Sequence, residues 1–187
     1  MQKEKKVVRF GSVSSQIDLP NLIEVQLQSY DWFLQAVMYS IRGTCDRLRT
    51  ACLLIVDNRL VSAGYNGSIS GTPHCDDAGH LIIERHCERT LHGEENAIIN
   101  ARGRSLDGAE AFVLGTPCIR CAKLLVAAGV RRIHILGTYA NSRGADFLEM
   151  LANQTGVELI QHDLDPLDLI IEAMKVLASK GGILHGR

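Results

Sequence analysis

The sequence predicts an α/β fold in which helices cover both faces of one sheet. Apolar runs of strand length alternate with stretches of helical periodicity, and this order is typical of strands joined by helical crossovers. The 187 residues are enough for one compact domain with room for a small appendage. Hydrophobic residues make up 46% of the chain and charged residues 22%, so a core can form without disulfide bonds.

The first half of the chain begins with helical periodicity and continues with two strands. Residues 22–42 carry apolar side chains at helical spacing and predict a long helix. The continuous apolar run 51–56 predicts a buried strand, and 59–63 predicts a second one across the polar turn at Asp57 and Asn58. Residues 64–91 show little periodicity and are rich in Gly, His, Cys and Asp. So long an irregular segment should be functional or be held by something.

Strands and helices alternate regularly in the second half of the chain. Gly103 is a suitable end for the first helix of this half. The expected elements are a helix at 92–102, a strand at 109–114, a helix at 118–128, a strand at 132–136, a helix at 143–153, a strand at 157–161 and a helix at 166–179. The last helix is amphipathic, and its apolar face is expected to be a docking surface rather than an active site. That face consists of Leu169, Ile170, Ala173, Met174 and Leu177.

Charge and cysteine usage restrict the classes of function. The formal net charge is -1 and no long basic run occurs, which favours a small-molecule substrate over nucleic acid. No apolar stretch approaches eighteen residues and no signal-peptide pattern begins the chain, so we expect no membrane partner and a cytoplasmic location. Thiols stay reduced there, and the six cysteines are therefore metal ligands, reactive thiols or buried apolar residues such as Cys52.

Two short motifs carry the chemistry. His92-Gly93-Glu94 begins one expected helix, and Pro117-Cys118-Ile119-Arg120-Cys121 begins another after a strand. Cys118 and Cys121 are one helical turn apart, so both sulfurs can face one ion, and His92 can supply a third ligand. Three protein ligands with an open fourth position are typical of catalytic zinc. The pair His-x-Glu and Pro-Cys-x-x-Cys is the established signature of zinc nucleobase deaminases.

Glu94 is the expected catalytic residue. It lies too close in sequence to His92 to be a comfortable fourth ligand, yet it can accept a proton from a metal-bound water and pass it to the substrate. The alternative is a structural zinc site in which Glu94 is only a carboxylate at a helix start. The preceding Pro117, the upstream His-x-Glu and the alternating strands and helices favour catalysis.

Several further motifs match a known family in the correct order. They are RGTC at 42–45, GYNGSISG at 64–71, PHCDD at 73–77, HCERTLHGEENAI at 86–98, PCIRC at 117–121 and Tyr139. Over residues 31–165 the chain resembles the deoxycytidylate deaminases of the cytidine deaminase-like superfamily, in the branch that includes late-competence deaminases. The resemblance implies a three-layer α/β/α sandwich with a five-stranded mixed sheet, a zinc cofactor and a homo-oligomer. It implies hydrolysis of dCMP to dUMP and ammonia.

The resemblance also implies substrate contacts by Asn66, Gly93 and Tyr139. Glycines 64 and 67 let the backbone approach a nucleotide closely, or they merely form a turn after a strand. Leu114 and Gly115 replace a usual Thr-His pair, and Thr138 replaces a usual Asp, so the expected pocket wall differs from that of the family. A tRNA adenosine deaminase and a free-base or nucleoside deaminase are the alternatives within the same chemistry. An alternative of another class is a non-catalytic, zinc-held regulatory module associated with transcription machinery.

A second zinc site is expected in the irregular segment. Its candidate ligands are Cys45, Cys75, His80 and Cys87, with His74 and His86 as competitors. Relatives often carry Cys where His80 stands, and this exchange preserves ligation. A structural zinc here would explain how residues 64–91 stay ordered. The alternative is that these cysteines are reduced and buried.

Both ends extend beyond the family core. Residues 8–35, above all DLPNLIEVQLQSY at 18–30, resemble the beginning of the bacterial RNA polymerase β subunit. We interpret this segment as a fusion relic rather than a module that contacts polymerase. The expected organisation is an N-terminal extension at 1–30, a zinc deaminase domain at 31–165 and a C-terminal helical extension at 166–187.

Overall fold

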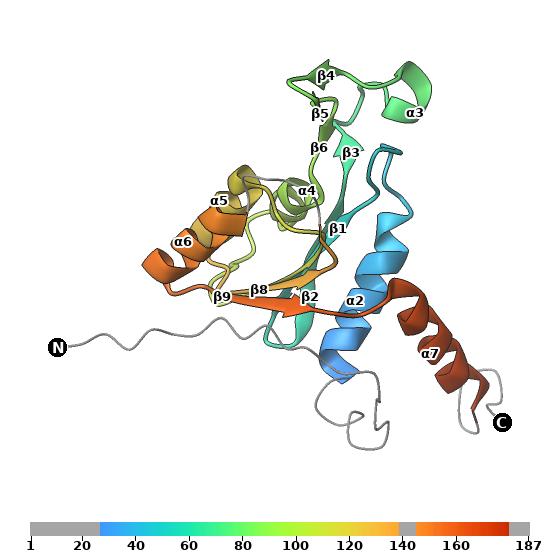
Figure 1. Ribbon diagram of the computed structural model, residues 1–187, viewed down its shortest axis with the longest axis vertical. Coiled ribbons are helices and arrows are strands. Elements are labelled where there is room, and N and C mark those ends of the chain that lie inside the picture. Colours follow the sequence, from blue (N-terminus) through green and yellow to red (C-terminus); the bar gives the residue numbers. More distant parts are fainter. Residues whose placement is uncertain (1–26, 139–144, 180–187) are drawn as a thin grey trace.

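A five-stranded mixed sheet forms the centre of the protein (Figure 1). The computed structural model describes residues 27–138 and 145–179. The strands lie in the order β2-β1-β7-β8-β9, with bounds β1 (Ala51–Val56), β2 (Arg59–Tyr65), β7 (Glu110–Leu114), β8 (Arg132–Leu136) and β9 (Glu158–His162). Strand β1 is antiparallel to β2 and to β7, whereas β7, β8 and β9 run parallel to one another.

Helices cover both faces of this sheet, which confirms the expected three-layer sandwich. One layer contains α4 (Gly93–Asn100), α5 (Ile119–Ala127) and α6 (Ala145–Thr155). The other contains α2 (Leu27–Ser40) and α7 (Pro166–Ala178), which pack against each other (Figure 1). On α7, Leu169 is buried against the α2 layer, whereas Met174 and Leu177 of the same expected apolar face remain exposed.

The apolar run in β1 follows from burial on both sides. Successive side chains of a strand point to opposite faces. Cys52 and Leu54 pack into the core beneath α4 and α5, and Leu53 and Ile55 pack into the core with Phe33 of α2. A strand buried on both faces needs a continuous rather than an alternating apolar sequence. Cys52 is fully buried there, and burial raises the pKa of its thiol.

The irregular segment projects from one end of the sheet (Figure 1). It contains a two-residue ribbon of β3 (Gly67–Ser68) with β6 (Thr90–Leu91) and a second ribbon of β4 (Ile82–Ile83) with β5 (His86–Cys87). The short helix α3 (Cys75–Ala78) lies between β3 and β4 in sequence. Within the described ranges, no helix is long and apolar enough to cross a membrane.

The observed bounds differ from the expected ones mainly at the ends of elements. Strand β2 continues two residues further, to Tyr65. Helices α4 and α5 begin one residue after His92 and Cys118, because these two residues have extended backbones and act as N-caps. Tyr139 and the polymerase-like residues 8–26 lie outside the described residues.

A chain of polar side chains crosses the face of the sheet that α2 covers. Glu110 Oε2 lies 2.9 Å from His134 Nε2, and His134 Nδ1 lies 3.0 Å from His162 Nε2. A carboxylate only accepts, so His134 donates to Glu110 and accepts from His162. The ring of His134 stacks on Phe112 with centroids 4.2 Å apart, and His162 meets Phe33 edge-on. Burial lowers the pKa of His162 to about 4 and also lowers that of His134.

This histidine pair predicts that acidification destabilises the fold. The unfolded chain takes up the His162 proton near pH 6.5, whereas the folded chain takes it up near pH 4. The unfolded state therefore binds more protons in this window, and stability present above pH 6.5 is lost as the pH falls toward 4. Thermal unfolding at several pH values should show a smaller acid-side slope for His162→Asn. His86→Asn, at an exposed histidine, should keep the slope of the unchanged protein. Equal slopes in both variants would contradict the assignment.

Candidate metal centre and substrate pocket

The starts of two helices bring His92, Cys118 and Cys121 together. His92 is the N-cap residue of α4 and Cys118 is the N-cap residue of α5, so both side chains lie at the N-terminal ends of these helices. His92 Nδ1 lies 3.6 Å from Cys118 Sγ and 3.4 Å from Cys121 Sγ. The three ligand atoms lie within 4.8 Å of one another. Two sulfurs and one imidazole nitrogen in this arrangement fit a zinc site with an open fourth position.

The electrostatics of this cluster favour a thiolate. The Cys121 side chain and then His92 stabilise the charged sulfur, which lowers the pKa of Cys118 to about 3. The backbone amide of Cys121 also donates to Cys118 Sγ, at 3.5 Å, as expected for a thiolate at a helix N-terminus. In turn Cys118 raises the pKa of His92 to about 9. A bound zinc would require thiolates and a neutral imidazole, so binding would release protons from this cluster.

Glu94 is the second residue of α4 and is buried, with 5% of its surface exposed. It lines the same cavity as His92 and Cys118. Burial raises the pKa of its carboxyl above the ordinary value. A carboxyl with a raised pKa beside a metal site is suited to take up a proton and return it at neutral pH.

The cavity beside this cluster has a volume of about 340 Å³, which is large enough for a small ligand. Among the sequence-predicted substrate contacts, Asn66 lines it. Gly93 instead packs against β1, where a Cβ atom would lie 3.2 Å from Ala51 Cα. Leu114, at the position where the sequence departs from the family, is part of the cavity wall.

Asn66 is already engaged by the loop that precedes β1. Its Oδ1 accepts from the Thr50 backbone amide at 2.9 Å, and its Nδ2 donates to the Leu48 carbonyl at 2.7 Å. These bonds leave one amide hydrogen and one acceptor lone pair of the side chain. Asn66 therefore shapes the cavity wall through this loop, and its substrate contact stays a prediction.

Sequence reasoning missed several residues of the cavity wall. Further lining residues come from four segments: Arg47 and Thr50 from the loop before β1, Glu88 from the irregular segment, Thr116 from the loop after β7, and Arg120 from the first turn of α5. Arg120 lies between the two cysteines of a motif that was recognised, so its position was a usable signal. The loop before β1 offered no such signal, because a local sequence pattern does not show which distant loop will line the cavity next to a motif.

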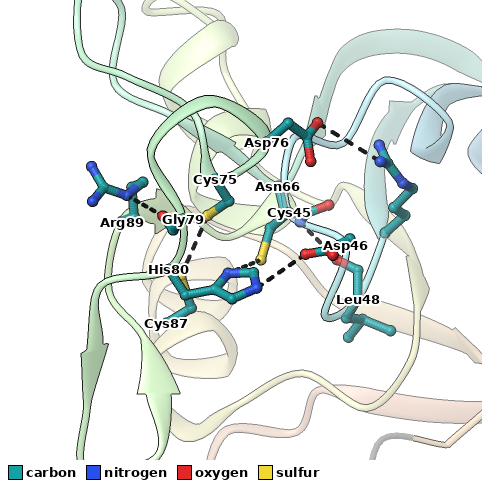
Figure 2. Close-up of polar contacts among 11 residues, drawn as sticks. Cys45, Asp46, Leu48, Asn66, Cys75, Asp76, Gly79, His80, Cys87 and Arg89 are labelled. Carbon is teal, nitrogen blue, oxygen red and sulfur yellow. Dashed lines mark hydrogen bonds and ion pairs between the residues drawn. The ribbon is translucent and has the colours of Figure 1, made fainter.

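The second expected set of ligands also converges, on the irregular segment (Figure 2). The ligand atoms of Cys45, Cys75, His80 and Cys87 lie within 4.8 Å of one another. Cys75 Sγ lies 3.5 Å from Cys87 Sγ, and Cys45 Sγ lies 3.7 Å from His80 Nδ1. All four side chains point toward a common centre in Figure 2. Among the described residues, this cluster includes neither His74 nor His86.

His80 has the orientation typical of a metal ligand. Its Nδ1 faces the cysteines, and its Nε2 lies 3.1 Å from Asp46 Oδ1. A carboxylate on the far nitrogen commonly fixes the tautomer of a metal-binding histidine. Cys45 and Cys87 also line the 340 Å³ cavity, so this cluster borders the expected substrate site.

Comparison with known proteins gives consistent matches. A family model described as "Cytidine and deoxycytidylate deaminase zinc-binding region" matches residues 27–137. The ComE operon protein 2 of Bacillus subtilis is 35% identical over 80% of this chain and 79% of its own length. Human deoxycytidylate deaminase is 33% identical over 57% of this chain, and the match spans 63% of the human protein.

A solved structure extends this likeness to three dimensions. The dCMP deaminase from the cyanophage S-TIM5, in complex with dCMP and dUMP, superposes with a TM-score of 0.58. The match is 26% identical and covers 71% of this chain and 95% of the phage chain. A deaminase/reductase from Thermotoga maritima, at 20% identity and a TM-score of 0.55, shares the fold.

Proposed function

Because the chain belongs to the zinc-binding cytidine and deoxycytidylate deaminase family, we propose that it converts dCMP to dUMP and ammonia. The observation that carries this proposal is the buried Glu94 carboxyl in the cavity that His92 and Cys118 also line. The phage relative, whose complex contains dCMP and dUMP, supports the choice of nucleotide.

In this reaction water replaces the 4-amino group of the cytosine ring, and the amino group leaves as ammonia. A zinc ion held by His92, Cys118 and Cys121 would lower the pKa of a bound water to roughly 7. Glu94 lines the cavity and is placed to accept a proton from the attacking water and to transfer it to the ring nitrogen. A second proton passes through Glu94 to the leaving amino group, so the carboxyl ends the cycle as it began. The cavity that Glu94 and His92 line would hold the base beside these groups.

Ammonia release from a panel of substrates tests the proposal. Zinc-loaded protein should turn over dCMP with a higher kcat/KM than CMP, dCTP, deoxycytidine or guanine. A tRNA substrate is added to the panel, and preferred turnover of deoxycytidine, guanine or adenosine in tRNA would replace dCMP with one of the other deaminase substrates. Zinc binding without turnover of any of them would favour the non-catalytic regulatory module.

We also propose that Cys45, Cys75, His80 and Cys87 hold a structural zinc. The support is their convergence and the Asp46 contact of His80. The purified protein should then contain two zinc ions per chain by elemental analysis. Cys75→Ser should retain one ion and lower the thermal midpoint by roughly 5–10 °C, since binding free energy at such sites contributes to folding.

Cys52→Ala is the matched control, because it removes a buried thiol outside both clusters. It should keep two zinc ions. A single zinc ion in the unchanged protein, or no loss of zinc from Cys75→Ser, would rule out the second site.

A further inference from the structure

One buried carboxylate links the two helix starts that carry the three expected metal ligands. Glu95, the third residue of α4, is 8% exposed. Its Oε2 accepts from the His92 backbone amide at 2.8 Å, and its Oε1 lies 2.7 Å from Nη2 of Arg120. Arg120 belongs to the first turn of α5, between Cys118 and Cys121. Glu95 therefore bonds to the backbone of one ligand and to the segment that carries the other two.

Both oxygens of Glu95 are used in this bridge. The carboxylate lies next in sequence to buried Glu94, and both acidic groups act on the Cys121 thiol. An unpaired buried carboxylate is costly, and Arg120 supplies its counter-charge. The guanidinium also has a fixed donor geometry, so the ion pair restrains the orientation of Arg120 relative to Glu95 as well as the distance between them.

We propose that the Glu95–Arg120 pair is a positioning device that sets the spacing of His92 relative to Cys118 and Cys121, and so tunes zinc affinity and turnover. This inference rests on the proposed function for its kinetic part only. Helices α4 and α5 are also held by their packing on the sheet. The charged bridge joins the N-termini of the two helices. A small shift of one helix start there would directly change the distances between the metal ligands.

Two simpler roles are possible for these residues, and each has its own signature. If Glu95 were only a helix cap, its loss would lower the thermal midpoint without changing zinc affinity. If Arg120, whose side chain is 55% exposed at the cavity, bound the substrate phosphate directly, its loss would raise KM for dCMP but not for deoxycytidine.

The test compares Glu95→Gln, Arg120→Met and the double variant with the unchanged protein. Glutamine retains an acceptor for the His92 amide and removes the ion pair. Zinc affinity of the His92–Cys118–Cys121 site is measured by competition with a chromophoric chelator, in a Cys75→Ser background that isolates this site. Kinetics are measured on dCMP and deoxycytidine, and thermal midpoints are recorded for every protein.

Each single variant should weaken zinc binding by roughly 10–100-fold and lower kcat by about 10-fold, with KM changed less than about 2-fold. The double variant should be no worse than either single one, because both remove the same interaction. Arg120→Lys should recover part of the affinity. Lys175→Gln, which breaks the exposed pair with Glu172 on α7, is the control and should change nothing.

Unchanged zinc affinity, additive losses, or a rise of KM confined to dCMP would each overturn the positioning role. The affinity measurements need no substrate. A protein that turns over none of the tested substrates would therefore refute the proposed function, while the affinity data would still decide the role of Glu95 and Arg120.

Discussion

Glu94→Gln is expected to lower kcat on dCMP by about 10²–10⁴-fold while zinc stays bound. Glutamine has nearly the same shape as glutamate and can occupy the same buried position on α4. It cannot take up a proton from water at neutral pH, and it cannot deliver one to the leaving amino group. The three metal ligands are untouched, so the loss should appear in the chemical step rather than in metal content.

The measurement is single-turnover ammonia release together with zinc content of the same samples. Glu88→Gln is the matched control, because Glu88 also lines the cavity but is exposed. It should keep kcat within a few-fold of the unchanged protein. If Glu94→Gln retained most of the activity, Glu94 would lose its assigned role. If it lost zinc, the residue would have to be reconsidered as part of the metal site.

The fold and the metal centre were predictable because their signals are local. Apolar runs such as 51–56 reveal strands buried on both faces, and the Cys-x-x-Cys spacing places two sulfurs on one helical turn whatever surrounds them. Ligand chemistry and the family resemblance together suggested the second cluster, with His74 and His86 left as competing ligands. The convergence of the ligands could be tested only in three dimensions.

The role of Glu95 was missed for a definite reason. The sequence signal for a reciprocal helix cap is Ser or Thr followed three residues later by Glu or Gln. Here the capping residue is His92, and its side chain belongs to the metal cluster, so the usual pattern is absent. Arg120 was missed because the two unspecified positions of Cys-x-x-Cys carry no expectation. Both omissions concern contacts between two segments. A motif specifies the residues of one segment and carries no information on the segment that it contacts.

Gly64→Ala is expected to destabilise the protein by about 3 kcal/mol or more. From sequence, Gly64 was a candidate for nucleotide approach or a turn. The structure places it inside β2, against the backbone of α4. A Cβ atom there would lie 2.2 Å from both Ala97 N and Gly93 O. Backbone atoms cannot rotate away as a side chain can, so the strand and the helix would have to separate.

Chemical denaturation measures this loss, and Gly103→Ala separates it from the general cost of replacing glycine. Gly103 has a φ of 79°, but nothing lies within 4 Å of an added Cβ, so alanine there should cost only about 1–2 kcal/mol through the backbone. A smaller effect at Gly64 than at Gly103 would contradict the steric argument.

The same contact connects stability to the active site. The atoms that an alanine at position 64 would strike belong to α4, the helix that carries Glu94 and Glu95 and that His92 caps. A displacement of α4 that relieves the clash would move Glu94 and change the spacing of His92 relative to α5. Folded Gly64→Ala protein, recovered at low temperature, should therefore show weaker zinc binding and a lower kcat than Gly103→Ala protein of equal helicity. Equal zinc affinity in the two variants would show that α4 moves as a unit with α5, and that the close approach of Gly64 matters for folding alone.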